Sequence, residues 1–169
     1  MDKKMVVGES TTTSSLPSTS IVKGSQQFKI TRYSLLNGIG SGKYLASDTL
    51  SVGGHDWAIY CYPDGQNDDD NAAYVSLFIV LVSEASKDVT ALFELALLDQ
   101  SGNEKHKLHS QFQTIPQSGP YTLKCCGSKW GFKRFIKKTD LEASKFLKDD
   151  CLYVNCRVGV VSNCREGLD

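Results

Sequence analysis

The stretch Gly127-Ser-Lys-Trp-Gly-Phe-Lys-Arg-Phe-Ile136 combines three aromatic residues with three basic residues in ten positions. Trp130 and Phe132 are two residues apart, so on an extended strand their side chains point to the same face. Gly131 lies between them, and a glycine inside a strand leaves room for another backbone to approach. This pattern suits a strand that captures an extended peptide by strand addition. The same spacing also fits two core residues, and spacing alone leaves both interpretations open.

Outside this stretch, segments rich in β-branched and aromatic residues alternate with turn signals over most of the chain. The predicted strands are 28–36, 44–52, 55–62, 74–83, 89–99, 107–115 and 151–161. One helix is predicted at 139–147, where Thr139 and Glu142 form a capping box. Seven or eight strands with one short helix predict an antiparallel β-sandwich.

Two of the predicted strands, 74–83 and 89–99, are apolar on both faces. A strand at the surface of a sandwich normally alternates between apolar and polar residues, because one of its faces is solvated. The outer surface of one sheet is therefore not fully exposed to solvent, and we expect that another part of the chain covers it or that a partner binds to it.

Composition excludes several classes of function. The chain has 169 residues, enough for one ordinary domain, and its 19 basic residues balance 19 acidic ones. Zero net charge gives no general attraction to nucleic acid or to an anionic membrane. The longest apolar run, near 77–82, is too short to span a bilayer, and no signal sequence opens the chain. We therefore expect an intracellular protein, with residues 1–24, rich in Ser and Thr, as a flexible leader.

The six cysteines form no CxxC pair and show no regular disulfide spacing. Cys151 and Cys156 lie five apart on a predicted strand and face opposite ways, which disfavours a shared metal. We interpret all six as reduced thiols.

Catalytic and cofactor motifs are absent. Residues 37–43 resemble a phosphate-binding loop, but Asn37 replaces its first glycine and Tyr44 its Ser/Thr. The acidic run 64–71 lacks the central glycine and final glutamate of a calcium-binding loop. His106 and His109 face opposite ways on a strand. The sequence thus predicts a protein that is not an enzyme and binds neither a metal nor a cofactor.

With these elements in place, the chain resembles the MATH domain (meprin and TRAF homology), most closely that of plant BTB/POZ-MATH proteins and more distantly that of animal speckle-type POZ proteins. The resemblance covers about residues 25–162 and leaves 163–169 as a C-terminal tail. Its most specific segments are 44–57, 62–65, 74–83, 130–136 and 147–152.

The resemblance implies an all-β fold: an eight-stranded antiparallel sandwich with one or two short helices and a shallow groove for short linear peptides. Trp130 and Phe132 match the aromatic pair of the family, and Phe78 stands where the animal proteins have a tyrosine. The implied peptide-binding residues are Phe78, Phe93, Ser110, Tyr121, Gly127, Ser128, Lys129, Trp130, Gly131, Phe132 and Lys133.

The function implied is that of a substrate-recognition module in a ubiquitin-ligase adaptor of the cullin-3 type, in the nucleus and cytoplasm. It would bind peptides that read as an apolar residue, a polar residue and a Ser/Thr run, in transcription factors and other regulators. The ligase would be engaged only through a BTB domain, which this chain lacks, and the chain alone is expected to be monomeric. Two alternatives stay open: a MATH/TRAF-like interaction domain that self-associates, and a lectin-like sandwich that binds sugars.

Lys129 departs from the family pattern, because the animal proteins have an acidic residue before the tryptophan. A lysine cannot accept a hydrogen bond from a substrate hydroxyl. We therefore expect tolerance of acidic or phosphorylated residues at that position of the substrate.

Overall fold

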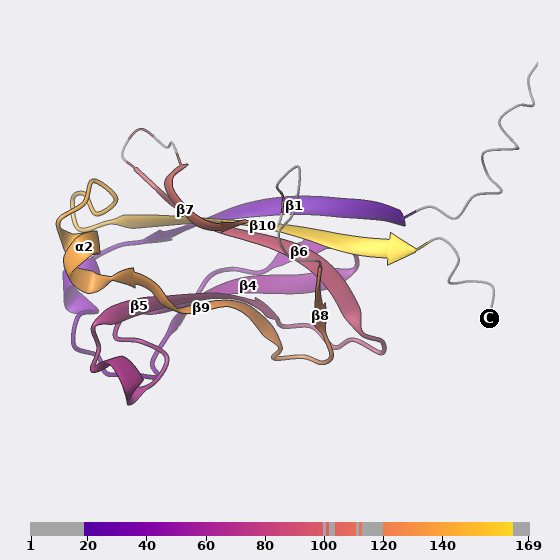
Figure 1. The fold of residues 1–169 in the computed structure, drawn as a ribbon, viewed down its shortest axis with the longest axis horizontal. Helices are drawn as coiled ribbons and strands as arrows, with labels where there is room; N and C mark the ends of the chain where they lie inside the picture. Colours follow the sequence, from indigo (N-terminus) through magenta and orange to yellow (C-terminus); the bar gives the residue numbers. More distant parts are fainter. Residues whose placement is uncertain (1–18, 100, 102–103, 111, 113–119, 164–169) are drawn as a thin grey trace, which may run out of the picture.

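The computed structural model describes residues 19–99, 101, 104–110, 112 and 120–163, which form two antiparallel β-sheets packed face to face (Figure 1). One sheet has the order β1-β10-β6-β7, with β8 also paired to β6. The other has the order β2-β4-β5-β9, with β3 also paired to β4. The strands are β1 (Thr19–Ile30), β2 (Leu45–Ala46), β3 (Leu50–Val52), β4 (His55–Tyr62), β5 (Tyr74–Leu81), β6 (Val89–Leu98), β7 (Glu104–Ser110), β8 (Tyr121–Leu123), β9 (Lys129–Lys137) and β10 (Leu152–Asn163).

The predicted all-β sandwich is confirmed. Ten strands are present in the described residues because the strand predicted at 44–52 is divided into β2 and β3, and because β8 is an additional short strand. The remaining elements are two 3-10 helices, η2 (Tyr33–Leu35) and η3 (Asp68–Asp70), and the short helix α2 (Lys138–Glu142).

Strand β1 begins well before the predicted position. It runs antiparallel to β10 over twelve residue pairs, from Thr19 opposite Asn163 to Ile30 opposite Leu152. Residues 19–24, which composition assigned to the flexible leader, are therefore part of the sheet. The strand also ends at Ile30, and Tyr33 is buried in η2 rather than in a strand.

Helix α2 is shorter than predicted, and the capping box is wrong. The helix is preceded by Lys137, which makes no side-chain cap, and it ends at Glu142. Its start is fixed by contacts with the rest of the fold: the Lys138 N–H donates to the Ala73 carbonyl at 2.9 Å, and the Lys138 ammonium lies 2.6 Å from an Asp64 carboxylate oxygen.

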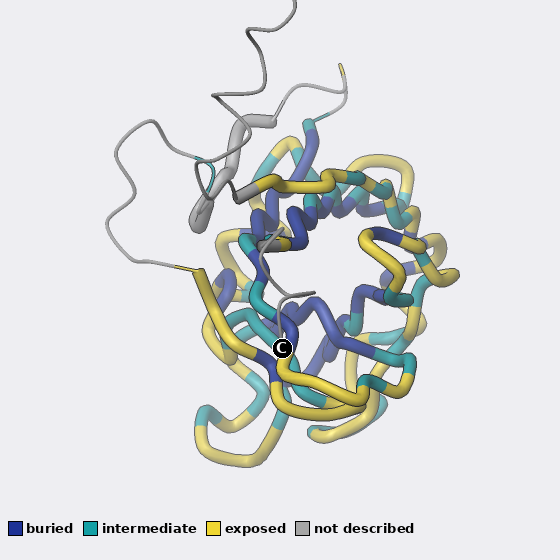
Figure 2. Tube along the Cα trace, turned by 90° about the vertical axis from the view of Figure 1, so that its right-hand side faces the viewer, coloured by how far each residue is buried: buried dark blue, intermediate teal, exposed yellow. Residues whose placement is uncertain are grey.

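The core lies between the two sheets. Viewed along the strands, the buried segments of both layers lie toward the space between the sheets, and exposed segments lie mostly at the periphery (Figure 2). Trp57 of β4 is fully buried, and its ring meets that of Phe93 of β6 edge-on, with ring centroids 5.5 Å apart. This contact joins the two sheets at the centre of the molecule.

Strand β5 is buried on both faces, as its sequence predicts. Leu77 and Ile79 belong to the central core, whereas Phe78 and Val80 form a second cluster with Tyr62 on the outer face. Aromatic side chains thus cover part of the outer face of the sheet that contains β9.

The five cysteines in the described part of the chain, namely Cys61, Cys125, Cys126, Cys151 and Cys156, are free thiols, and Cys164 lies outside it. The same residues contain no helix with the length and apolarity needed to cross a membrane. They also contain no group of three or more potential metal ligands.

Candidate functional site

Strand β9 is an edge strand, and this position exposes its backbone. It pairs with β5 on one side, and no other strand of the described residues pairs with it. Its start is held by the turn 125–128, where the Gly127 N–H donates to the Leu81 carbonyl and the Leu81 N–H donates to the Ser128 carbonyl. An edge strand offers unpaired N–H and C=O groups to an incoming chain.

The register of β5 and β9 identifies which backbone groups point outward. Ile79 lies opposite Trp130 and Leu77 lies opposite Phe132. Leu81 directs its N–H and C=O toward β9. Backbone groups alternate in direction along a strand, so Ile79 and Leu77 also point toward β9 and pair with Trp130 and Phe132. The backbone groups of Lys129 and Gly131 therefore point away from β5, toward the space that an added strand would occupy.

Gly131 is required by the neighbouring strand of the same chain. A Cβ atom at this position would overlap the Leu77 carbonyl oxygen, and it would lie 2.6 Å from the Phe78 Cα and 2.8 Å from its ring. The sequence-based interpretation assigned the missing side chain to the approach of another chain. The structure shows that β5 makes the close approach.

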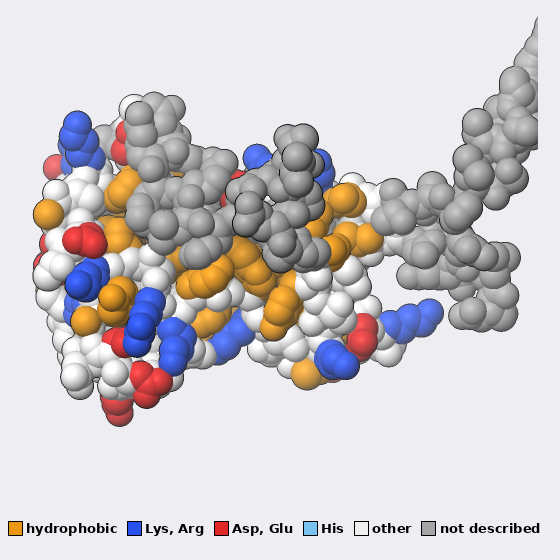
Figure 3. Space-filling view, viewed as in Figure 1, with side chains coloured by type: hydrophobic (Ala, Val, Ile, Leu, Met, Phe, Trp, Pro, Cys, Tyr) orange, Lys and Arg blue, Asp and Glu red, His pale blue; other side chains and the backbone are white. Residues whose placement is uncertain are grey.

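Trp130 and Phe132 face the inner side of the sheet at its open edge. Both are half-buried and pack against the central core. Trp130 stacks on Phe93, with centroids 5.4 Å apart and planes inclined by 22°, and meets Phe132 edge-on at 5.2 Å. Hydrophobic side chains gather in a band between β9 and β6 on this side of the molecule (Figure 3). Each ring packs on the core, as the core interpretation predicts, and keeps an exposed side, so that peptide binding by these rings stays a prediction.

Lys129 and Phe78 lie on the opposite, outer face of the same sheet. The Lys129 ammonium lies 4.6 Å from the centroid of the Phe78 ring and 5.9 Å from that of Tyr62. Burial lowers the pKa of Lys129. The residues predicted from the family are therefore divided between the two faces of β9, with its edge between them.

The remaining predicted residues are distributed around this edge. Phe93 is fully buried behind Trp130, so it supports that ring and does not reach the surface. Tyr121 is 44% exposed on β8, on the sheet opposite β9. Ser110 ends β7 opposite Glu94, and its side chain lies outside the described residues. Lys133 is exposed and pairs with Asp69 at 2.9 Å.

Tyr62 is a site residue that the sequence reasoning missed. It is 7% exposed, contacts Phe78 edge-on with centroids 5.8 Å apart, and helps to surround the Lys129 ammonium. Alternation along β4 was the available signal, since Tyr60 and Tyr62 face away from the buried Cys61 between them.

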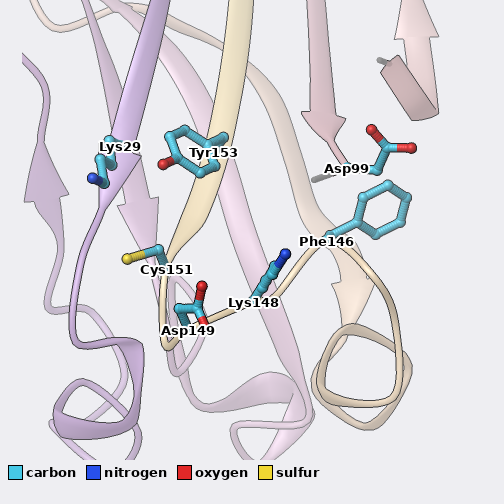
Figure 4. Close-up of a pocket in the computed structure, with 7 residues that line it drawn as sticks. All are labelled: Lys29, Asp99, Phe146, Lys148, Asp149, Cys151 and Tyr153. Carbon is cyan, nitrogen blue, oxygen red and sulfur yellow. The ribbon is translucent and has the colours of Figure 1, made fainter. Parts of the chain in front are cut away.

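A separate pocket of about 340 Å³ lies at the end of the sandwich where β10 begins (Figure 4). It contains Lys29, Lys148, Asp99 and Asp149, together with Phe146, Cys151 and Tyr153. The formal charges of the two lysines and two aspartates in its lining cancel. It includes none of the predicted site residues.

Comparison with known proteins gives consistent results. The sequence model of the MATH domain matches residues 25–158. The chain is 61% identical over 150 residues to BTB/POZ and MATH domain-containing protein 4 of Arabidopsis thaliana, a match that covers 89% of this chain and 32% of that protein. It is 58% identical over 146 residues to BTB/POZ and MATH domain-containing protein 3 of the same plant, covering 86% of this chain and 36% of that protein. The chain thus spans about a third of the length of these relatives.

Proposed function

Because this chain belongs to the MATH domain family, we propose that it is the substrate-recognition module of a ubiquitin-ligase adaptor of the cullin-3 type. The MATH fold and the BTB/POZ-MATH relatives support a role as a protein-interaction adaptor. The ligand would be a short linear segment of a substrate protein, such as a transcription factor, that reads as an apolar residue, a polar residue and a Ser/Thr run. The adaptor would act in the nucleus and cytoplasm and reach the ligase through a BTB domain outside this chain.

The observation that carries the proposal is the open edge of β9 beside half-exposed aromatic rings. Outward N–H and C=O groups of Lys129 and Gly131 can pair with an extended peptide. Trp130 and Phe132 lie next to them and can contact an apolar side chain of that peptide. Burial of one such side chain supplies about 1.5–3 kcal/mol, so a single chain is expected to bind the peptide weakly. Avidity in a larger assembly would strengthen this binding.

Replacement of the exposed ring tests this assignment. Trp130→Ala is expected to weaken binding of a Ser/Thr-rich peptide with one apolar anchor by at least about tenfold, because large aromatic side chains dominate such interfaces. Calorimetric titration of the purified chain with the peptide measures the change.

The matched control is Tyr153→Ala. Tyr153 is also a partly exposed aromatic, but it lies on β10 in the other sheet, with the Lys29 ammonium over its ring. Its loss should leave peptide affinity unchanged. Circular dichroism must show that both variants are folded, since Trp130 also packs on Phe93. Equal affinities for wild type and a folded Trp130→Ala would refute the assignment.

The same open edge also fits pairing with a second copy of the chain, the function of a self-associating interaction domain. Light scattering separates the two functions. A peptide-binding module is expected to have the mass of a monomer, and self-association through β9 would give a dimer that the peptide dissociates.

A further inference from the structure

The Lys129 ammonium lies on the outer face of β9 and is a candidate contact for a ligand anion. It lies above the rings of Phe78 and Tyr62, which are only 6% and 7% exposed. In the described part of the chain no carboxylate pairs with it. Burial lowers its pKa because the charged form loses water without gaining a counter-ion. An anion placed beside this ammonium would supply the missing partner.

Two other cations of β9, Lys133 and Arg134, do not offer the same opportunity. The Lys133 ammonium lies 2.9 Å from an Asp69 carboxylate oxygen, and the Arg134 guanidinium lies 2.8 Å from Asp70. Both charges are already matched within the chain. Of these three cations, Lys129 is therefore the one at which a ligand anion gains most.

The pleat of the sheet fixes where such an anion lies in a bound peptide. Trp130 faces the inner side of the sheet and Lys129 the outer side, since they are consecutive residues of one strand. A peptide added beside β9 continues the same pleat, so its consecutive side chains also alternate between the two faces. The peptide residue that contacts Trp130 and the one that contacts Lys129 are therefore direct neighbours in sequence, whichever way the peptide runs.

We propose that this chain selects peptides with an anionic side chain directly next to the apolar anchor, the anion binding Lys129 on the outer face and the anchor binding Trp130 on the inner face. This inference rests on the proposed function, because it requires a peptide along β9. The shared chemistry is a negatively charged oxygen group, which an Asp or Glu carboxylate and a phosphoserine both supply.

The test uses a set of labelled peptides with one apolar anchor in a serine background. Asp or phosphoserine is placed one residue before, one residue after or two residues after the anchor, and fluorescence anisotropy measures affinity for the purified chain. At one of the adjacent positions the anion should tighten binding about fivefold relative to serine. Two residues away it faces the Trp130 side and should give no gain. Comparison of the Asp and phosphoserine peptides shows which source is preferred.

Charge variants then assign the gain to one side chain. The ratio of the anionic-peptide to the serine-peptide affinity should fall to about one in Lys129→Met and below one in Lys129→Asp. The matched control, Lys137→Met, removes an exposed charge at the far end of the same strand and should keep the wild-type ratio.

The outcomes separate this inference from the proposed function. The proposed function stands if the serine peptide binds and Trp130→Ala weakens this binding by at least about tenfold. The inference is then wrong if the anion gives no gain, or if the gain persists in Lys129→Met. An equal gain at all three positions reflects general charge attraction and also overturns the inference. If no peptide of the set binds the folded wild-type chain, both are overturned.

Discussion

Gly131 shows how a single residue can serve both the fold and the site. Its missing side chain allows β9 to lie close to β5, and this approach sets the position of Trp130 and Phe132 on either side of it. The same residue directs its backbone groups toward the open edge. A change at Gly131 therefore alters stability and the binding edge together.

Replacement of this glycine by alanine should separate the two strands. In Gly131→Ala the new methyl group overlaps the Leu77 carbonyl oxygen, which is backbone and cannot rotate away. We expect a loss of about 1–3 kcal/mol in the free energy of unfolding, measured by urea denaturation, together with weaker peptide binding.

The control for this change is Lys137→Ala, at an exposed position of the same strand. It should leave both the unfolding midpoint and the peptide affinity close to wild type. Wild-type stability of Gly131→Ala would show that β9 can move away from β5 at no cost.

A buried ion pair links Asp64 to Lys138, the first residue of α2, and the same carboxylate also accepts a hydrogen bond from the loop at 38–40. The Asp64 carboxylate is 2% exposed and accepts from the Lys138 ammonium at 2.6 Å and from the Gly40 N–H at 2.8 Å. Burial alone would raise the pKa of this carboxyl, but hydrogen bonds from Lys138, Gly40 and Gly38 outweigh it and hold the pKa below its usual value. The pair thus connects the chain that follows β4 to the first residue of the helix.

Removal of this charge should destabilise the fold in a pH-dependent way. Asp64→Asn leaves the Lys138 ammonium buried without a counter-ion, which costs about 3 kcal/mol at pH 7. The pKa of Asp64 is lower in the folded chain than in the unfolded chain, where it is about 4. The stabilisation that the carboxylate gives the fold is therefore complete above the unfolded-state pKa and is lost as the pH falls through the folded-state pKa. Urea midpoints of wild type and Asp64→Asn should therefore differ most near pH 7 and converge below about pH 4.

An exposed acid on the neighbouring 3-10 helix provides the comparison. Asp69→Asn breaks only the surface pair with Lys133, so its unfolding midpoint should stay near the wild-type value throughout. A constant difference between wild type and Asp64→Asn from pH 7 to pH 3 would contradict the assigned role of Asp64.

These elements also show what sequence can and cannot predict. Alternation correctly predicted β4, β5, β6 and β10 to within about two residues, because their patterns follow from burial on a pleated sheet. It missed the first residues of β1, whose mostly polar or exposed side chains show no core pattern and which pair with β10. It also misplaced α2, since the contacts of Lys138 with Ala73 and Asp64 come from distant parts of the chain.

The same limit applies to the candidate site. The Trp-Gly-Phe pattern correctly placed Trp130 and Phe132 on one face of a strand, because this follows from local geometry. The burial of Phe93 behind Trp130 and the position of Lys129 above Phe78 depend on how strands from different parts of the chain pair. A single sequence contains no direct signal for such pairing.

At the scale of the whole molecule, both sheets contribute to one core. Cys61 of β4 and Cys156 of β10 lie on different sheets, yet both belong to the central cluster and are 1% exposed. Burial raises the pKa of each thiol to about 12, so neither forms a reactive thiolate near neutral pH. Cys125 and Cys126 are exposed beside β9.

Thiol alkylation therefore measures whether the sandwich unfolds as one unit. Iodoacetamide should modify Cys125 and Cys126 in the native chain, whereas Cys61 and Cys156 should react only after unfolding, because their thiols are inside the core. Since one cluster joins the two sheets, both buried thiols should become reactive at the same urea concentration when modification is followed by peptide mass spectrometry. Protection of Cys61 at a urea concentration where Cys156 is fully modified, or the reverse, would mean that one sheet persists without the other.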